Sequence, residues 1–162
     1  MEEKKQNREE PAWRLGEILV RNGHITWEQL EEALSIQKKT GKMLGEILRG
    51  KGFVTSRDLY QALAIQYRRI FVDFTHINVQ KDVLRLIPKG FVYEHKIMPL
   101  VLKDRMLLVA ISNPLNVWPE EQIKRYLGPG YEVRPVLACP EDIEEALFRH
   151  YGPPTAIQRP EA

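Results

Sequence analysis

Arg14, Gly16 and Gln37 are the residues whose types and spacing suggest chemistry, and two of them recur 29 positions later as Gly45 and Gln66. The guanidinium of Arg14 is a planar fork that fits the O6/N7 edge of guanine. A glycine in the first helical turn, where we place Gly16, lets an anion approach backbone N–H groups that lack an intrahelical partner. Each glutamine continues a leucine stripe on one helix face, where its amide could read a purine edge. These groups favour ligand binding rather than catalysis.

The same residues also have a purely structural interpretation. Gly16 could serve a tight helix–helix contact while Arg14 is solvated, and each glutamine could bond a buried backbone group. Both features stand at the same place in two copies of one motif, which favours a common role. Two copies of one surface suit a ligand that is itself two-fold.

The motif is an internal repeat, which runs from Arg14 to Gln37 and again from Met43 to Gln66. Twelve of the 24 aligned positions are identical, whereas about one or two would match by chance. Each copy predicts a short helix, a glycine that ends it, and a second helix that begins at a capping box. The glycines are Gly23 and Gly52, and the capping boxes are Thr26 with Gln29 and Thr55 with Asp58.

The chain changes character after Tyr67, where short apolar runs and helical segments alternate. We expect strands at Ile70–Phe74, Lys96–Leu102, Arg105–Ile111 and Tyr131–Ala138, the middle two forming a hairpin around Lys103-Asp104. We expect helices at Lys81–Ile87, Pro119–Leu127 and Pro140–Tyr151. The prediction is an α+β fold in which a helical tandem-repeat module (residues 13–67) packs on a small α/β module (68–152) with a roughly three-stranded sheet. Residues 1–12 and 153–162 are predicted to be flexible tails.

Composition excludes several classes of function. A formal net charge of +2, with no basic run interleaved with aromatics, argues against a DNA or RNA polymer as partner. The apolar runs are far shorter than a bilayer span, and a single cysteine excludes an internal disulfide. We therefore expect a cytoplasmic protein that reaches the inner face of the membrane only through a partner. The four histidines form no recognised metal-ligand cluster, and no Walker A sequence occurs, so we expect no metal, cofactor or ATP hydrolysis.

The pattern RLGxxLxxxGxIxxxxLxxxLxxQ, given twice with five residues between the copies, resembles the MshEN domain. The later segments Leu86-Ile87-Pro88, Met98-Pro99-Leu100 and Ile111–Leu115 also fit that family. MshEN is the N-terminal module of the assembly ATPases of type II secretion and type IV pilus systems, and it binds the near two-fold second messenger cyclic di-GMP. The resemblance implies one dinucleotide held across the two motifs.

Carried over by position, the resemblance implies a set of ligand-binding residues in each motif. In the first copy these are Arg14, Leu15, Gly16, Leu19, Gly23, Ile25, Leu30, Leu34 and Gln37. In the second copy they are Leu44, Gly45, Leu48, Gly52, Val54, Leu59, Leu63 and Gln66, and Asn113 is an additional candidate. Met43 stands where the pattern has arginine, with Lys42 adjacent, and Asn113-Pro114 replaces a frequent Asp-Pro step.

The leading hypothesis is therefore a cyclic di-GMP receptor domain with no catalytic residues, whose further partners are secretion or pilus assembly components. The alternative is a ligand-free interaction domain of the same family that docks an ATPase to a membrane platform component. Hydrolysis of the dinucleotide is a third hypothesis, but the chain shows no metal cluster or catalytic carboxylate pair to support it.

Overall fold

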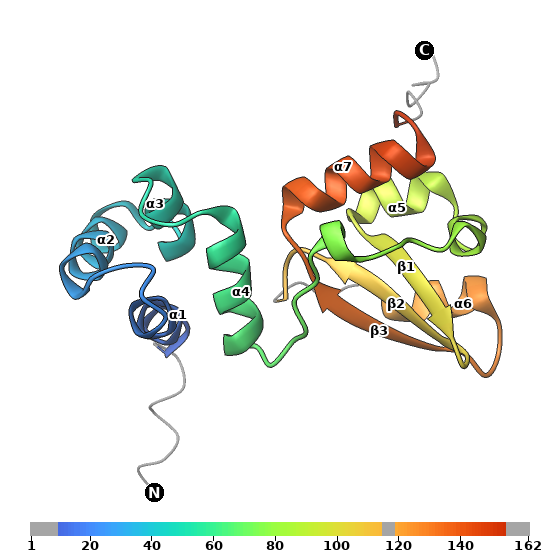
Figure 1. Ribbon diagram of the computed structural model, residues 1–162, viewed down its shortest axis with the longest axis horizontal. Coiled ribbons are helices and arrows are strands. Elements are labelled where there is room, and N and C mark those ends of the chain that lie inside the picture. Colours follow the sequence, from blue (N-terminus) through green and yellow to red (C-terminus); the bar gives the residue numbers. More distant parts are fainter. Residues whose placement is uncertain (1–9, 115–118, 155–162) are drawn as a thin grey trace, which may run out of the picture. The chain divides into compact units, whose positions relative to one another are not determined.

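The computed structural model describes residues 10–114 and 119–154, and within residues 10–14 it describes the backbone only. The described chain is α+β, as predicted, and divides into two compact units. The first unit ends at Ile70 and the second begins at Phe71. Helices make up the first unit, and the second contains a three-stranded sheet with helices (Figure 1).

The first unit contains two helix-turn-helix motifs built on the same local plan. Their helices are α1 (Glu10–Arg21), α2 (Trp27–Thr40), α3 (Leu44–Gly50) and α4 (Ser56–Gln66). After α1 and α3 the chain passes through glycines with positive φ, 77° at Gly23 and 74° at Gly52, a conformation that suits glycine. Both predicted capping boxes are present, so the backbone N–H groups of the N-cap residue and of the third helical residue are satisfied in α2 and α4.

The two motifs are interleaved. Helix α1 packs against α4, and α2 packs against α3, so the second helix of one motif meets the first helix of the other. The buried side chains of all four helices form one hydrophobic cluster, in which Leu19, Leu30 and Leu48 have no exposed surface. Neither motif therefore has a core of its own.

The sheet of the second unit has the order β1-β2-β3, with β1 (Met98–Lys103), β2 (Met106–Ile111) and β3 (Glu132–Leu137). The predicted β1–β2 hairpin is confirmed, but its two turn residues are Asp104 and Arg105, one position later than expected. Both have positive φ, as the tight hairpin turns that match strand twist require. Strands β2 and β3 run parallel, and α6 (Glu120–Leu127) lies between them in the chain.

Helices cover the sheet. Helix α7 (Pro140–Tyr151) packs against β1 and β2, α5 (Lys89–His95) packs against α7, and α6 packs against β3 (Figure 1). The backbone N–H of Gln80 donates to Leu100, and the side-chain amide of Gln80 accepts from Leu102. This residue therefore occupies part of the outer edge of β1, which limits the pairing of another strand there.

Two predictions of local structure are wrong, and one helix was not predicted. Ile70–Phe74 is not a strand, because only an isolated bridge joins Phe71 to Leu137, and Phe74–His76 is a short 3₁₀ helix. The segment predicted as a helix at Lys81–Ile87 is a 3₁₀ helix over Lys81–Arg85. Helix α5 was not predicted, since Lys89–His95 contains glycine and several aromatic or β-branched residues. Its formation rests on burial of Val92, which has no exposed surface.

Candidate functional site

Gly16 and Gly45 each lie under a leucine of the following helix. A Cβ atom on Gly16 would stand 2.5 Å from Cδ1 and 2.9 Å from Cδ2 of Leu30. At Gly45 the corresponding distances are 3.1 Å and 3.0 Å to the two methyl carbons of Leu59. The glycines thus permit the close helix–helix contact that the sequence left open as an alternative to ligand approach.

The prediction that Gly16 lies in a first helical turn is wrong. Helix α1 begins at Glu10, so Gly16 is in its second half, where backbone N–H groups bond within the helix. Helix α1 starts three residues before the predicted module. Pro11 lies in the segment predicted as a tail, but proline is compatible with the first turn of a helix, where a backbone N–H has no partner within the helix. Gly45 does lie in the first turn of α3.

Burial divides the predicted apolar ligand residues into two groups. Eight are at most 7% exposed and belong to the core: Leu15, Leu19, Ile25, Leu30, Leu44, Leu48, Val54 and Leu59. Leu34 and Leu63 are only partly buried against that core. A ligand at the surface of the motifs would therefore meet the second pair directly, and the first eight would act by shaping the helices beneath it.

The two glutamines follow those partly buried leucines along α2 and α4. Gln37 lies one turn before the end of α2, and Gln66 is the last residue of α4; both side chains are half-buried. Leu34 with Gln37 and Leu63 with Gln66 are therefore equivalent pairs that combine apolar surface with an amide. Such a pair can cover a planar base and hydrogen-bond its edge.

The remaining predicted residues differ in exposure. Gly23 and Gly52 are exposed at the helix turns, whereas Gly16 is buried. Met43 is 61% exposed and precedes α3 as its N-cap residue, with no capping hydrogen bond from its side chain. Asn113 is exposed and belongs to the second unit. The side chain of Arg14 lies outside the part of the structure that is described.

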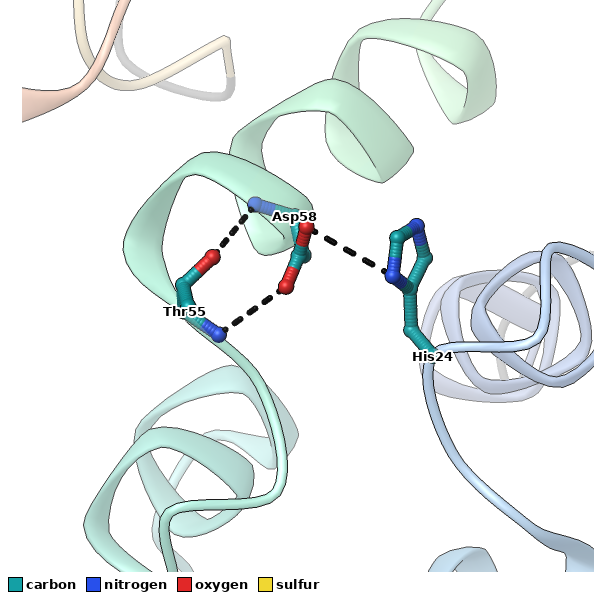
Figure 2. Close-up of polar contacts among 3 residues, drawn as sticks. All are labelled: His24, Thr55 and Asp58. Atoms are coloured by element: carbon teal, nitrogen blue, oxygen red, sulfur yellow. Dashed lines mark hydrogen bonds and ion pairs between the residues drawn. The ribbon is translucent and has the colours of Figure 1, made fainter.

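A polar contact between the two motifs was not predicted. His24 Nδ1 of the first motif lies 3.5 Å from Asp58 Oδ1 of the second, and Asp58 also belongs to the capping box with Thr55 (Figure 2). His24 stands in the turn between α1 and α2, next to Gly23. Only the tertiary packing of the motifs brings the two side chains together.

Asp58 keeps its carboxylate charged over a wider range of pH than a free aspartate. Burial raises its pKa, but the hydrogen bonds with the side chain and backbone of Thr55 and the charges of His24 and Arg57 outweigh burial, so the pKa lies below its ordinary value. The charge at the start of α4 is favourable for the helix dipole. It also holds the turn of the first motif against the second.

Within the described residues, no three His, Cys, Asp or Glu side chains gather in a way that could hold a metal ion. Among residues 10–114 and 119–154, no helix combines the length and the apolar character that a bilayer crossing requires. The repeated surface of half-buried leucines and glutamines remains as the candidate site.

Two interleaved helix-turn-helix motifs followed by a small α/β unit define the architecture of this chain. The MshEN domain family matches residues 64–157, which is more than half of the chain. The chain therefore belongs to the MshEN domain family, a family of non-catalytic N-terminal regulatory domains.

Solved structures share this architecture. The structure of MshE with cyclic di-GMP has a TM-score of 0.68 and 30% identity, covering 85% of this chain and 99% of that one. This similarity extends into the repeat region, which precedes most of the family match. The N-terminal domain of XpsE, at 17% identity and a TM-score of 0.53, covers 85% of this chain and 93% of that one, and it shows the fold alone.

A curated relative of this chain is a longer protein. The type IV pilus assembly ATPase PilB of Myxococcus xanthus (strain DK1622) is 31% identical over 139 residues, which are 86% of this chain. The chain spans 24% of the length of that relative.

Proposed function

We propose that this domain is a cyclic di-GMP receptor that holds one dinucleotide across its two motifs and regulates a type II secretion or type IV pilus system. The observation that carries the proposal is the similarity to MshE, whose structure contains cyclic di-GMP, over 85% of this chain at 30% identity. The doubled motif adds an independent argument, because its two equivalent surfaces match the near two-fold symmetry of the ligand.

The geometry of the motifs supports a division of roles. The partly buried Leu34 and Leu63 supply apolar surface on which bases can pack, and Gln37 and Gln66 supply amides for the base edges. The exposed Gly23 and Gly52 leave the helix turns free of side-chain atoms. Arg14 contributes a guanidinium that suits guanine, and Asn113 is an additional candidate for an edge contact.

Isothermal titration of the chain with cyclic di-GMP tests the proposal directly. We expect one dinucleotide per chain and a Gln37→Ala variant that binds about 5- to 150-fold more weakly, since a lost hydrogen bond to a desolvated edge costs about 1–3 kcal/mol. Gln61→Ala is a matched control, because Gln61 is a half-buried glutamine of α4 outside the paired leucine–glutamine positions. Equal affinity of the Gln37→Ala and parent proteins would remove this glutamine from the site, and a parent protein without affinity would refute the receptor function.

A ligand-free docking domain is the second candidate. Trp27, Met43 and Ile65 of the helical unit are each more than half exposed, and exposed apolar side chains of this size suit a protein partner. Under this alternative the chain would bind a secretion or pilus assembly component and show no affinity for the dinucleotide. The same titration therefore distinguishes the two functions.

A further inference from the structure

The two helices that carry the paired leucines and glutamines have little direct packing on each other. Leu34 and Gln37 stand on α2, and Leu63 and Gln66 stand on α4. Within the part of the chain that is described, the main packing partners of α2 are α3 and α1, whereas α4 packs against α1. The spacing between the two surfaces of the proposed site is therefore set mostly through other helices.

A polar contact joins the starts of α2 and α4 directly. His24 lies two residues before Thr26, the N-cap residue of α2, and its Nδ1 atom is 3.5 Å from Oδ1 of Asp58 in the first turn of α4 (Figure 2). The backbone of His24 is fixed, because its N–H donates to the carbonyl of Leu19 and the next residue, Ile25, is only 5% exposed. The contact therefore holds the two helix starts at one separation.

The carboxylate of Asp58 is oriented independently of the histidine. Its Oδ2 atom accepts from the backbone N–H of Thr55 at 3.2 Å, and its own backbone N–H donates to the hydroxyl of that threonine at 3.1 Å. A side chain that is already ordered loses less entropy when it makes a further contact. The side chains of His24 and Asp58 are 30% and 28% exposed, so solvent screens the contact between them only in part.

Another contact between the motifs differs in both respects. Lys51 Nζ lies 2.8 Å from Oε1 of Glu32, and these side chains are 43% and 48% exposed. It joins α2 to the end of α3 and does not involve α4. Exposed pairs of long side chains contribute little, because ordering them costs entropy and solvent screens their charges. The pair of Lys51 and Glu32 is therefore a suitable comparison for the pair at the helix starts.

We infer that His24 and Asp58 are positioning residues, which hold α2 and α4 at the separation that one dinucleotide spanning both motifs requires, without touching the ligand themselves. The inference rests on the proposed function and extends it. A ligand that occupies two surfaces at once binds well only where their spacing matches its own length. The gain cannot exceed the strength of the contact, which for a partly exposed ion pair corresponds to at most about fivefold in affinity.

Isothermal titration of variants of the complete chain with cyclic di-GMP tests the inference, at a temperature where circular dichroism shows every variant to be folded. His24→Phe removes the ring nitrogens and introduces the residue type that the second motif has at the equivalent position, Phe53. Asp58→Asn keeps an oxygen for the cap but loses the charge. We expect each single variant to bind about two- to fivefold more weakly than the parent, and the double variant to bind no more weakly than either of them, because both changes break one contact.

Two further variants separate positioning from other effects. His24→Asn keeps an N–H donor near the place of Nδ1 and should bind as the parent does. Glu32→Gln, the matched control, breaks the exposed contact between the motifs and should also leave the affinity unchanged. A His24→Asn protein as weak as His24→Phe, or an equal loss in Glu32→Gln, would overturn the inference.

The other failures are distinguishable. If His24→Phe alone weakens binding, or if the two losses add in the double variant, the residues act separately and the positioning role is wrong. If every variant binds as tightly as the parent, the contact serves stability alone, and the receptor function stands without the inference. If the parent chain binds no cyclic di-GMP, the proposed function fails, and the inference fails with it.

Discussion

Replacing Gly16 with alanine tests whether the close contact between α1 and α2 is what requires glycine. The new Cβ would stand 2.5 Å from one methyl carbon of Leu30 and 2.9 Å from the other, whereas carbon atoms pack best at about 3.5–4.0 Å. Leu30 has no exposed surface, so its side chain cannot move into solvent. Either α1 and α2 separate or Leu30 leaves its rotamer, at a cost of about 1–3 kcal/mol.

Helix propensity acts in the opposite direction. Alanine within a helix is about 1 kcal/mol more favourable than glycine, so the net loss in the free energy of unfolding is about 1 kcal/mol with a range of about 0–2 kcal/mol. At Gly45 the new Cβ would be 3.0 Å from the nearest carbon of Leu59, and the expected destabilisation is smaller. Gly50 is the control, because a Cβ there meets nothing within 4 Å.

Urea unfolding of the complete chain, followed by circular dichroism and by amide resonances of α1 and α2, measures these differences. We expect the stability order Gly50→Ala, then Gly45→Ala, then Gly16→Ala, and in a thermal scan the last variant should melt about 2–4 °C below the parent. Shortening Leu30 to valine should cost less in the Gly16→Ala background than in the parent, since the two side chains then share the space. A Gly16→Ala protein as stable as the Gly50→Ala protein would refute the packing explanation and return Gly16 to a role in ligand approach.

Two further predictions concern the cap of α4. Thr55→Ala removes the hydroxyl that accepts a hydrogen bond from the backbone N–H of Asp58, and it should lower the free energy of unfolding, measured in urea, by about 1 kcal/mol. Thr55→Ser keeps a hydroxyl and should remain close to the parent in stability. Equal stability of the alanine and serine variants would contradict this prediction. The lowered pKa of Asp58 means that the unfolded chain binds more protons than the folded chain below the ordinary value of 3.8. The stability that Asp58 contributes is therefore fully present above that value and is lost as the pH falls through the lower folded pKa. The difference in free energy of unfolding between the parent and Asp58→Asn should narrow as the pH is lowered. A difference that stays constant over this pH range would contradict the prediction.

Local signals were sufficient where one element could be specified by its own residues. Helix α7 was predicted with its observed bounds because Pro140 begins it, acidic residues occupy its first turn, basic residues its last, and Gly152 ends it. The capping boxes of α2 and α4 were found for the same reason, since Thr26 and Thr55 need only a partner three residues later. These are short-range interactions that the sequence displays directly.

Tertiary packing determined the features that the sequence left out. The residues of α5 have a weak helix propensity, and the helix forms because it packs against α7. Lys96 ends it with a positive φ, which is uncommon for lysine and could not be predicted from the residue type. The parallel pairing of β2 and β3 could have been found, because a helix between two strands is typical of a parallel crossover. The division of the motif leucines into buried and partly buried residues could not have been predicted. Leu30 and Leu34 lie on the same helix stripe and differ only in what packs above them.

The interleaving of the motifs explains how exposed residues can differ between the two copies while the packing stays the same. Because α1 packs with α4 and α2 with α3, each motif contributes to the core of the other, and a substitution in the shared cluster would disturb both. The glycine and leucine positions of the two copies are accordingly held to the same packing requirements. Met43 lies outside that cluster and is 61% exposed, so a change there acts on one motif alone. Two motifs built in this way can keep the same packing while exposed positions differ between the copies.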